Sequence, residues 1–148
     1  MPDPAVALRV AALRLLTRRE HSRAELQGKL AAQAESQEQL DAVLDRLQSE
    51  NLLSDQRFAT QRVVARANRY GNARLKQELR HRGIGDDDIL AALPEAGSEV
   101  ERCRSVWSRK FGQLPQSREE RAKQMRFLQY RGFSTDAIRQ AMRGVDEE

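Results

Sequence analysis

The chain has few aromatic residues, cysteines, prolines and glycines, and it contains no long apolar run. Aromatic side chains make up 5% of its 148 residues, beside one cysteine, four prolines and eight glycines. The single cysteine, Cys103, excludes a disulfide within the chain and is typical of a reducing compartment. No uncharged stretch approaches the length of about 20 residues that spans a bilayer. We therefore expect no membrane segment and no signal peptide, and a cytoplasmic protein.

The abundant residue types favour helices. Good helix formers such as Ala, Leu, Arg, Gln and Glu dominate the composition. Hydrophobic residues make up 39% and charged residues 32%, which is little apolar material for one large globular core. This balance favours an extended array of small cores. The composition therefore predicts an all-α protein.

The stretch 70–84 is repeated on both sides at an offset of 49 residues. When the sequence is aligned with itself at this offset, apolar residues align with apolar residues and small residues align with small ones. Leu79 aligns with Leu30 and Leu128, Ala73 with Ala24 and Ala122, Ile89 with Leu40 and Ile138, and Leu93 with Leu44 and Met142. Gly83 also meets Gly132 on the C-terminal side. Matches at one offset in both directions indicate three copies of one unit.

Nine helix starts can be assigned from capping residues, three in each unit. They are Asp3 before Pro4, the capping boxes Ser22-x-x-Glu25, Ser36-x-x-Gln39, Ser98-x-x-Glu101 and Ser117-x-x-Glu120, and Ser54 or Asp55, Asn72, Asp86 and Ser134. We therefore predict nine helices in three tandem three-helix repeats, stacked into an elongated, curved array. The chain 1–148 is expected to be a single domain, with repeats at about 3–53, 54–96 and 97–144.

The repeat match is weakest in the first helix of each unit. Phe58 and Trp107 correspond at the offset of 49, but the equivalent position in the first unit is Arg9. Either that helix has slipped along its unit, or the first unit is a variant terminal cap.

Motifs for catalysis and metal binding are missing. The sequence has no phosphate-binding Gly-rich loop and no His-Glu-x-x-His. His21 and His81 have no second histidine or cysteine at ligand spacing. The acidic run 86–88 precedes an apolar helical stretch, where carboxylates stabilise a helix start, and Cys103 fits a small core side chain. We expect no enzyme activity, no metal and no cofactor.

Positive charge is concentrated in the middle of the chain. Residues 57–82 carry eight basic side chains and one acidic one, Glu78. One interpretation is that these side chains only form solvated helix faces. The other is that they form a surface for an anionic partner, either nucleic acid or an acidic protein.

Helical spacing selects candidate contact residues within this basic region and in the third unit. Arg62, Arg66 and Arg69 are predicted to form one outward stripe. Lys76 and Arg80 point away from the predicted buried residues of their helix, whereas Arg82 is interpreted as a helix-end charge. The full candidate set is Arg62, Arg66, Arg69, Tyr70, Arg74, Lys76, Arg80, Lys123, Arg126 and Tyr130, in which tyrosine could stack on an unpaired base.

Four stretches, read in order, resemble the RecX family of bacterial regulators of the RecA recombinase. They are LRLLTRREHSRAEL at 13–26, LLSDQRFA at 52–59, YGNARLKQELRHRGI at 70–84 and KQMRFLQYRGF at 123–133. Asn51 departs from the family pattern, which more often has glycine there, although asparagine suits the same backbone geometry.

The resemblance implies a binding protein whose partners are RecA and its filament on single-stranded DNA. It also implies inhibition of filament growth and of the ATPase, strand-exchange and co-protease activities of RecA. No residue is carried over as catalytic, direct contact with DNA stays open, and a monomer is expected. The alternatives are a RecA-independent nucleic-acid-binding helical module and an α-helical scaffold for another acidic protein.

Overall fold

The computed structural model describes residues 3–146, which contain helices and no strand. Nine α-helices and one short 3-10 helix follow in order. They are α1 (Pro4–Arg18), α2 (Arg23–Leu30), α3 (Gln37–Ser49), α4 (Asp55–Arg66), α5 (Asn72–His81), α6 (Asp86–Ala92), η1 (Leu93–Ala96), α7 (Glu99–Lys110), α8 (Arg118–Tyr130) and α9 (Thr135–Asp146). Within this described range no helix is both long and apolar enough to cross a membrane.

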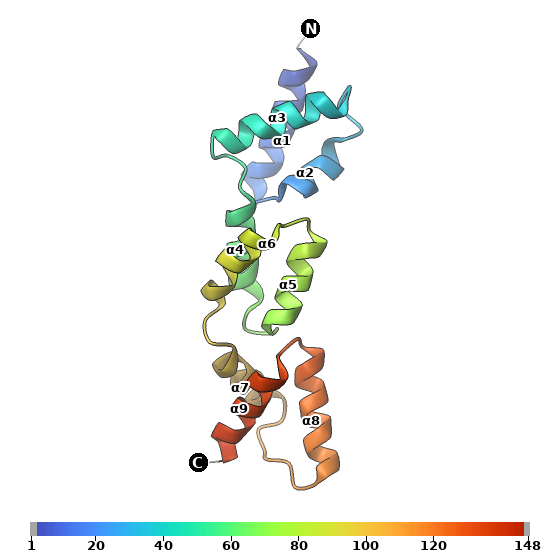
Figure 1. The fold of residues 1–148 in the computed structure, drawn as a ribbon. Helices are drawn as coiled ribbons and strands as arrows, with labels where there is room; N and C mark the ends of the chain where they lie inside the picture. Colours follow the sequence, from blue (N-terminus) through green and yellow to red (C-terminus); the bar gives the residue numbers. More distant parts are fainter. Residues whose placement is uncertain (1–2, 147–148) are drawn as a thin grey trace.

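The helices form three units that follow one another along an elongated body, with the two chain ends far apart (Figure 1). Each unit has its own apolar core. The first core is built around Leu26, Leu40 and Leu44, the second around Phe58, Leu75 and Ile89, and the third around Trp107, Leu128 and Ile138. The predicted all-α fold of three three-helix repeats is confirmed.

The first helix of the first unit is displaced along the repeat. Leu8 and Ala12 are the buried residues of α1. Their equivalents in α4 are the buried residues Ala59 and Val63, which lie 51 residues later, whereas the offset of the repeat is 49 residues. Arg9 does not enter the core and instead forms an ion pair with Glu50 at 2.7 Å. Of the two alternatives that the sequence left open, the structure favours the first: α1 is shifted along its unit relative to α4 in the second unit.

Most predicted helix starts have the expected side-chain cap, but two do not. The predicted capping boxes at Ser36, Ser98 and Ser117 are incomplete, because each serine accepts a hydrogen bond from the third helical N–H without the return bond from the side chain of that residue. Ser22 and Glu25 form a complete capping box, and Asn51, with φ of 62°, adopts the left-handed conformation expected of it. Asn72 and Asp86 are first helical residues, preceded by the N-caps Gly71 and Gly85. The predictions that Asn72 and Asp86 are N-caps are therefore wrong.

The first junction joins the start of α2 to the end of α5. The Ser22 hydroxyl donates a hydrogen bond to the Arg82 carbonyl at 3.0 Å, and the Arg82 guanidinium lies 3.7 Å from the Glu25 carboxylate. The Arg23 N–H donates to the Asp55 carboxylate at 2.7 Å. Arg82 therefore links two units, and its interpretation as only a helix-end charge is wrong.

The second junction joins the start of α5 to the end of α8 in the same way. The Gly71 N–H donates to the Arg131 carbonyl at 2.9 Å, and the Asn72 N–H donates to the Glu99 carboxylate at 2.7 Å. The Asn72 side chain is not free to cap its own helix, because its oxygen accepts a hydrogen bond from Arg102. A contact between units thus explains why α5 starts differently from the sequence prediction.

The two junctions use residues 49 positions apart. Ser22 corresponds to Gly71, and the carbonyl of Arg82 corresponds to that of Arg131. The offset that identifies the repeat in the sequence is therefore also the offset between equivalent contacts, as expected of an array in which each unit touches only its neighbours.

Candidate anion-binding surface of the second and third units

Three of the candidate arginines converge on one acid in the second unit. The Arg66 guanidinium makes two hydrogen bonds to Glu78, at 2.7 and 2.8 Å. Arg62 and Arg74 lie 3.7 and 3.6 Å from the same carboxylate. The expected outward stripe is therefore wrong for Arg62 and Arg66, which turn towards α5, and only Arg69 of that stripe is exposed.

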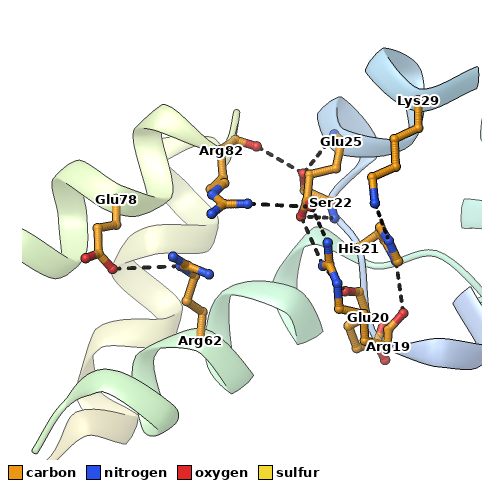
Figure 2. A network of polar contacts seen from close by, with 9 residues as sticks. All are labelled: Arg19, Glu20, His21, Ser22, Glu25, Lys29, Arg62, Glu78 and Arg82. Carbon is orange, nitrogen blue, oxygen red and sulfur yellow. Dashed lines mark hydrogen bonds and ion pairs between the residues drawn. The ribbon is translucent and has the colours of Figure 1, made fainter. Parts of the chain in front are cut away.

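Arg62 lies between this cluster and the first junction (Figure 2). Its Nε is buried and has no hydrogen-bond partner in the described structure. Burial lowers the pKa of the Arg62 guanidinium, and the nearby positive charge of Arg82 lowers it further, against the opposing effect of Glu78. Glu78 is thus shared among more cations than it can pair well.

Tyr70 is surrounded by guanidinium groups. Arg66 and Arg74 each lie 4.6 Å from the centre of its ring, and Arg131 lies 5.4 Å from it. Such contacts attract a cation to the aromatic face. The Tyr70 ring therefore holds these arginines in place through cation–π contacts.

A basic groove lies between the second and third units, with a volume of about 460 Å³. Its lining residues are Arg69, Tyr70, Val106, Arg109, Lys110, Phe127 and Arg131, and we call this set the basic groove. Lys110 and Arg131 each lie 5.2 Å from the centre of the Phe127 ring. The lining contains four cations and no acid, so the groove is expected to attract anions.

Five of these lining residues were not among the sequence candidates: Val106, Arg109, Lys110, Phe127 and Arg131. The offset of 49 pairs Arg131 with Arg82, which had been interpreted as a helix-end charge, and Arg109 and Lys110 occupy the last turn of α7. A local pattern could not distinguish them from ordinary helix-end cations.

The remaining candidates are accessible to a partner. Tyr130 is 76% exposed, and Arg69, Arg80, Lys123 and Arg126 are also exposed. Lys76 is half-buried and makes no hydrogen bond or ion pair with the described residues, whereas Arg80 lies 3.4 Å from the Asp86 carboxylate. The structure thus separates the arginines held by Glu78, with Tyr70 beside them, from candidates that are exposed or, like Lys76, half-buried without a partner.

The residues considered for chemistry have structural roles. Cys103 is fully buried, and burial raises the pKa of its thiol to about 12. His21 is also buried, with Nδ1 3.0 Å from the Arg19 carbonyl and Nε2 3.4 Å from the Lys29 ammonium (Figure 2). The acidic run opens α6, as expected of a helix start. None of these groups forms a constellation suited to catalysis.

Comparison with known proteins accounts for nearly the whole chain. Family models described as the first, second and third three-helix domains of RecX match residues 9–47, 54–93 and 98–142. Proteins named "Regulatory protein RecX" from Ralstonia nicotianae and Herminiimonas arsenicoxydans are 47% and 48% identical to it. The alignments cover 99% and 96% of this chain, and 92% and 95% of those proteins.

A solved structure has the same fold. The crystal structure of RecX from Lactobacillus salivarius aligns over 100% of both chains with a TM-score of 0.86, at 22% sequence identity.

Proposed function

This chain belongs to the RecX family, and from that membership we propose that it regulates the RecA recombinase by binding RecA or its filament on single-stranded DNA. Its main effect is inhibition of filament growth, and with it of ATP hydrolysis, strand exchange and co-protease activity. The chain acts by binding, without a catalytic step or a cofactor. We further propose that it does so as a monomer in the cytoplasm.

The observation that carries the proposal is the near full-length match to proteins named as regulators. The shape supports it, because three small cores in a row present a long surface to a filamentous partner (Figure 1). The charge supports it as well, since exposed cations on the second and third units would attract an acidic protein surface or DNA phosphates.

The test is the ATPase activity of RecA on single-stranded DNA. Adding the purified chain in comparable or smaller amounts than RecA should lower the rate of ATP hydrolysis, and the chain should sediment with the filament. Unchanged hydrolysis together with no binding would rule the proposal out. Tight binding to DNA combined with no effect on RecA would favour the nucleic-acid-binding module instead.

A charge reversal locates the surface that contacts RecA. Lys76→Glu with Arg80→Glu should weaken binding to the filament, because Lys76 has no internal partner and Arg80 is largely solvated. The matched control is Arg14→Glu with Arg18→Glu, two exposed cations of α1 in the first unit. Equal weakening by both pairs would show that the effect is only one of net charge.

A further inference from the structure

We propose that the basic groove is a binding site for a compact polyphosphate, in which two or more phosphates are linked directly, either free or as the tail of a nucleotide. The bound ligand contacts the second and third units at once and holds the junction between them. This goes beyond the proposed regulation of RecA, because only residues of this chain take part. The argument rests on the unpaired cations, the net charge of the groove, the construction of its wall and its size.

The cations of the basic groove keep their charge available. In the part of the chain that the structure describes, none of its four cations forms an ion pair with a carboxylate. The Arg109 guanidinium donates only to the neutral carbonyl of Asn68. The second unit differs, since Glu78 there attracts three arginines. A ligand that enters the basic groove therefore meets positive charge that no acid of the chain compensates.

The net charge of the groove matches more than one phosphate. The groove lies where three helices end: Arg69 follows α4, Lys110 is the last residue of α7, and Arg131 directly follows α8. Each helix C-terminus carries a partial charge of about −0.5, so the three ends offset roughly 1.5 of the positive charges. The excess of roughly two to three charges is more than one phosphate group of about −1.5 to −2 neutralises.

The wall of the groove is built before any ligand binds. Arg102 of α7 donates to the carbonyls of Ala67 and Tyr70 at 3.1 and 2.8 Å, and Arg109 of α7 donates to the carbonyl of Asn68. The segment after α4 is thus tied to the third unit by two arginines. A site formed in advance costs less free energy of ordering when its ligand binds.

The aromatic rings of the groove are used to hold cations. Arg131 lies over both Tyr70 and Phe127, 5.4 and 5.2 Å from the ring centres, and Lys110 lies 5.2 Å from the centre of the Phe127 ring. Because cations already contact these rings, recognition of a ligand depends on charge and on charge-assisted hydrogen bonds. This favours phosphate groups over the base of a nucleotide.

The size of the groove separates a compact polyphosphate from other anions. Its volume of about 460 Å³ lies in the range of roughly 300–1,000 Å³ that is usual for small-molecule sites. A single phosphate fills little of this space and does not reach the cations of both units. A nucleic-acid strand separates its phosphates by sugars, and its unpaired bases need free aromatic faces. Directly linked phosphates bring the most charge into the groove.

The test is isothermal titration calorimetry of the full chain with inorganic tripolyphosphate, without magnesium, DNA or RecA. We expect binding at one site, and a thermal unfolding midpoint that rises with the tripolyphosphate concentration. Orthophosphate and AMP should bind at least about tenfold more weakly, because each offers one phosphate to four cations. ATP distinguishes the two sources of the ligand: affinity equal to that of tripolyphosphate identifies the phosphate chain alone, and higher affinity identifies a nucleotide.

Neutral variants locate the site. Arg69→Gln with Lys110→Gln should weaken the binding of tripolyphosphate by at least about tenfold. The matched control is Arg14→Gln with Arg18→Gln, which removes two exposed cations from α1 and should leave the affinity nearly unchanged. Circular dichroism of each variant establishes that it folds.

The contact with both units is tested by the single variants. Arg69→Gln removes a cation of the second unit, and Lys110→Gln removes one of the third. Each should weaken binding and reduce the rise of the unfolding midpoint with tripolyphosphate. A loss in only one of them would show that the ligand does not join the two units.

Three outcomes would overturn the proposal as a whole. One is the absence of both binding heat and a change in the unfolding midpoint, and another is an equal loss of affinity in the α1 control. The third is displacement of tripolyphosphate by an oligothymidine as readily as by unlabelled ATP at equal phosphate concentration, which would indicate a groove for a strand. Inhibition of RecA without tripolyphosphate binding would leave the proposed function standing and remove only this inference.

Discussion

Ala24 lies against Gly83 so closely that a Cβ added to Gly83 would be 2.4 Å from the Ala24 Cβ. At the second junction a Cβ added to Gly132, which lies 49 residues after Gly83, would be 2.3 Å from the Arg74 Cβ, one residue beyond Ala73, the position equivalent to Ala24. Both glycines also have positive φ, 81° and 92°. At each junction one helix start therefore packs directly on the turn that ends a helix of the next unit.

The first prediction concerns Gly83→Ala. Its Cβ would meet both an unfavourable backbone conformation and the rigid Ala24 Cβ, so the free energy of unfolding should fall by about 2–4 kcal/mol. Gly97 has a φ of 79° and open space around its Cβ position, so Gly97→Ala should cost only about 1–2 kcal/mol. Denaturant unfolding of the two variants separates the steric cost from the backbone cost.

A double mutant provides the control for this interpretation. Ala24→Gly removes the atom that an added Cβ would meet, so combined with Gly83→Ala it should recover part of the lost stability. Additive losses in the double mutant would show that Ala24 is not the obstacle.

The second prediction concerns Glu78→Gln. Removing the charge leaves Arg62, Arg66 and Arg74 close together without a carboxylate, and the free energy of unfolding should fall by about 1–2 kcal/mol. Thermal unfolding should show this at low salt, and high salt should reduce the difference. Asp87→Asn, on the exposed first turn of α6, should have almost no effect, and an equal loss there would argue against the cluster.

The third prediction concerns Arg102→Lys at the second junction. The Arg102 guanidinium donates to the carbonyls of Ala67 and Tyr70 at 3.1 and 2.8 Å, and also to the Asn72 side chain. A lysine ammonium cannot reproduce this planar set of bonds, so we expect a loss of about 1–2 kcal/mol and a broader unfolding transition as the third unit uncouples. Arg104→Lys, which loses only bonds of 3.3 and 3.5 Å, should be milder.

The fourth prediction concerns the pH dependence of stability and His21. Burial is the largest cause that lowers the pKa of His21 from 6.5, against the hydrogen bond to the Arg19 carbonyl, and the positive charges of Arg19 and Lys29 lower it further. The unfolded chain then binds this proton more readily than the folded chain. Stability should therefore fall as the pH drops below about 6.5 towards the folded-state pKa.

Denaturant unfolding at pH 7.5 and pH 5.5 measures this effect. His21→Gln should flatten the change in stability between the two values, and His81→Gln, at an exposed position, serves as the matched variant. An unchanged slope in His21→Gln would show that another group is responsible.

Much of the architecture was readable from the amino-acid sequence. Leu30, Leu79 and Leu128 recur at one offset, and all three are buried in their own units. Serine caps such as Ser22 and Ser98 mark helix starts that the structure retains. Burial of a helix face and capping are local properties, because both depend on residues within one or two turns. The sequence therefore determined the number of units, their helices and their cores.

The candidate site depended on contacts that no local pattern contains. Glu78 on α5 accepts a hydrogen bond from Arg66 on α4. The Asn72 side chain accepts a hydrogen bond from Arg102 of the next unit and therefore does not cap its own helix. In the basic groove, Arg69 from the segment after α4 and Lys110 from the end of α7 line the same site. A helical period shows which residues leave the core, but their partners depend on how neighbouring units are set against each other. Only the tertiary structure decided which cations are neutralised and which remain available to a ligand.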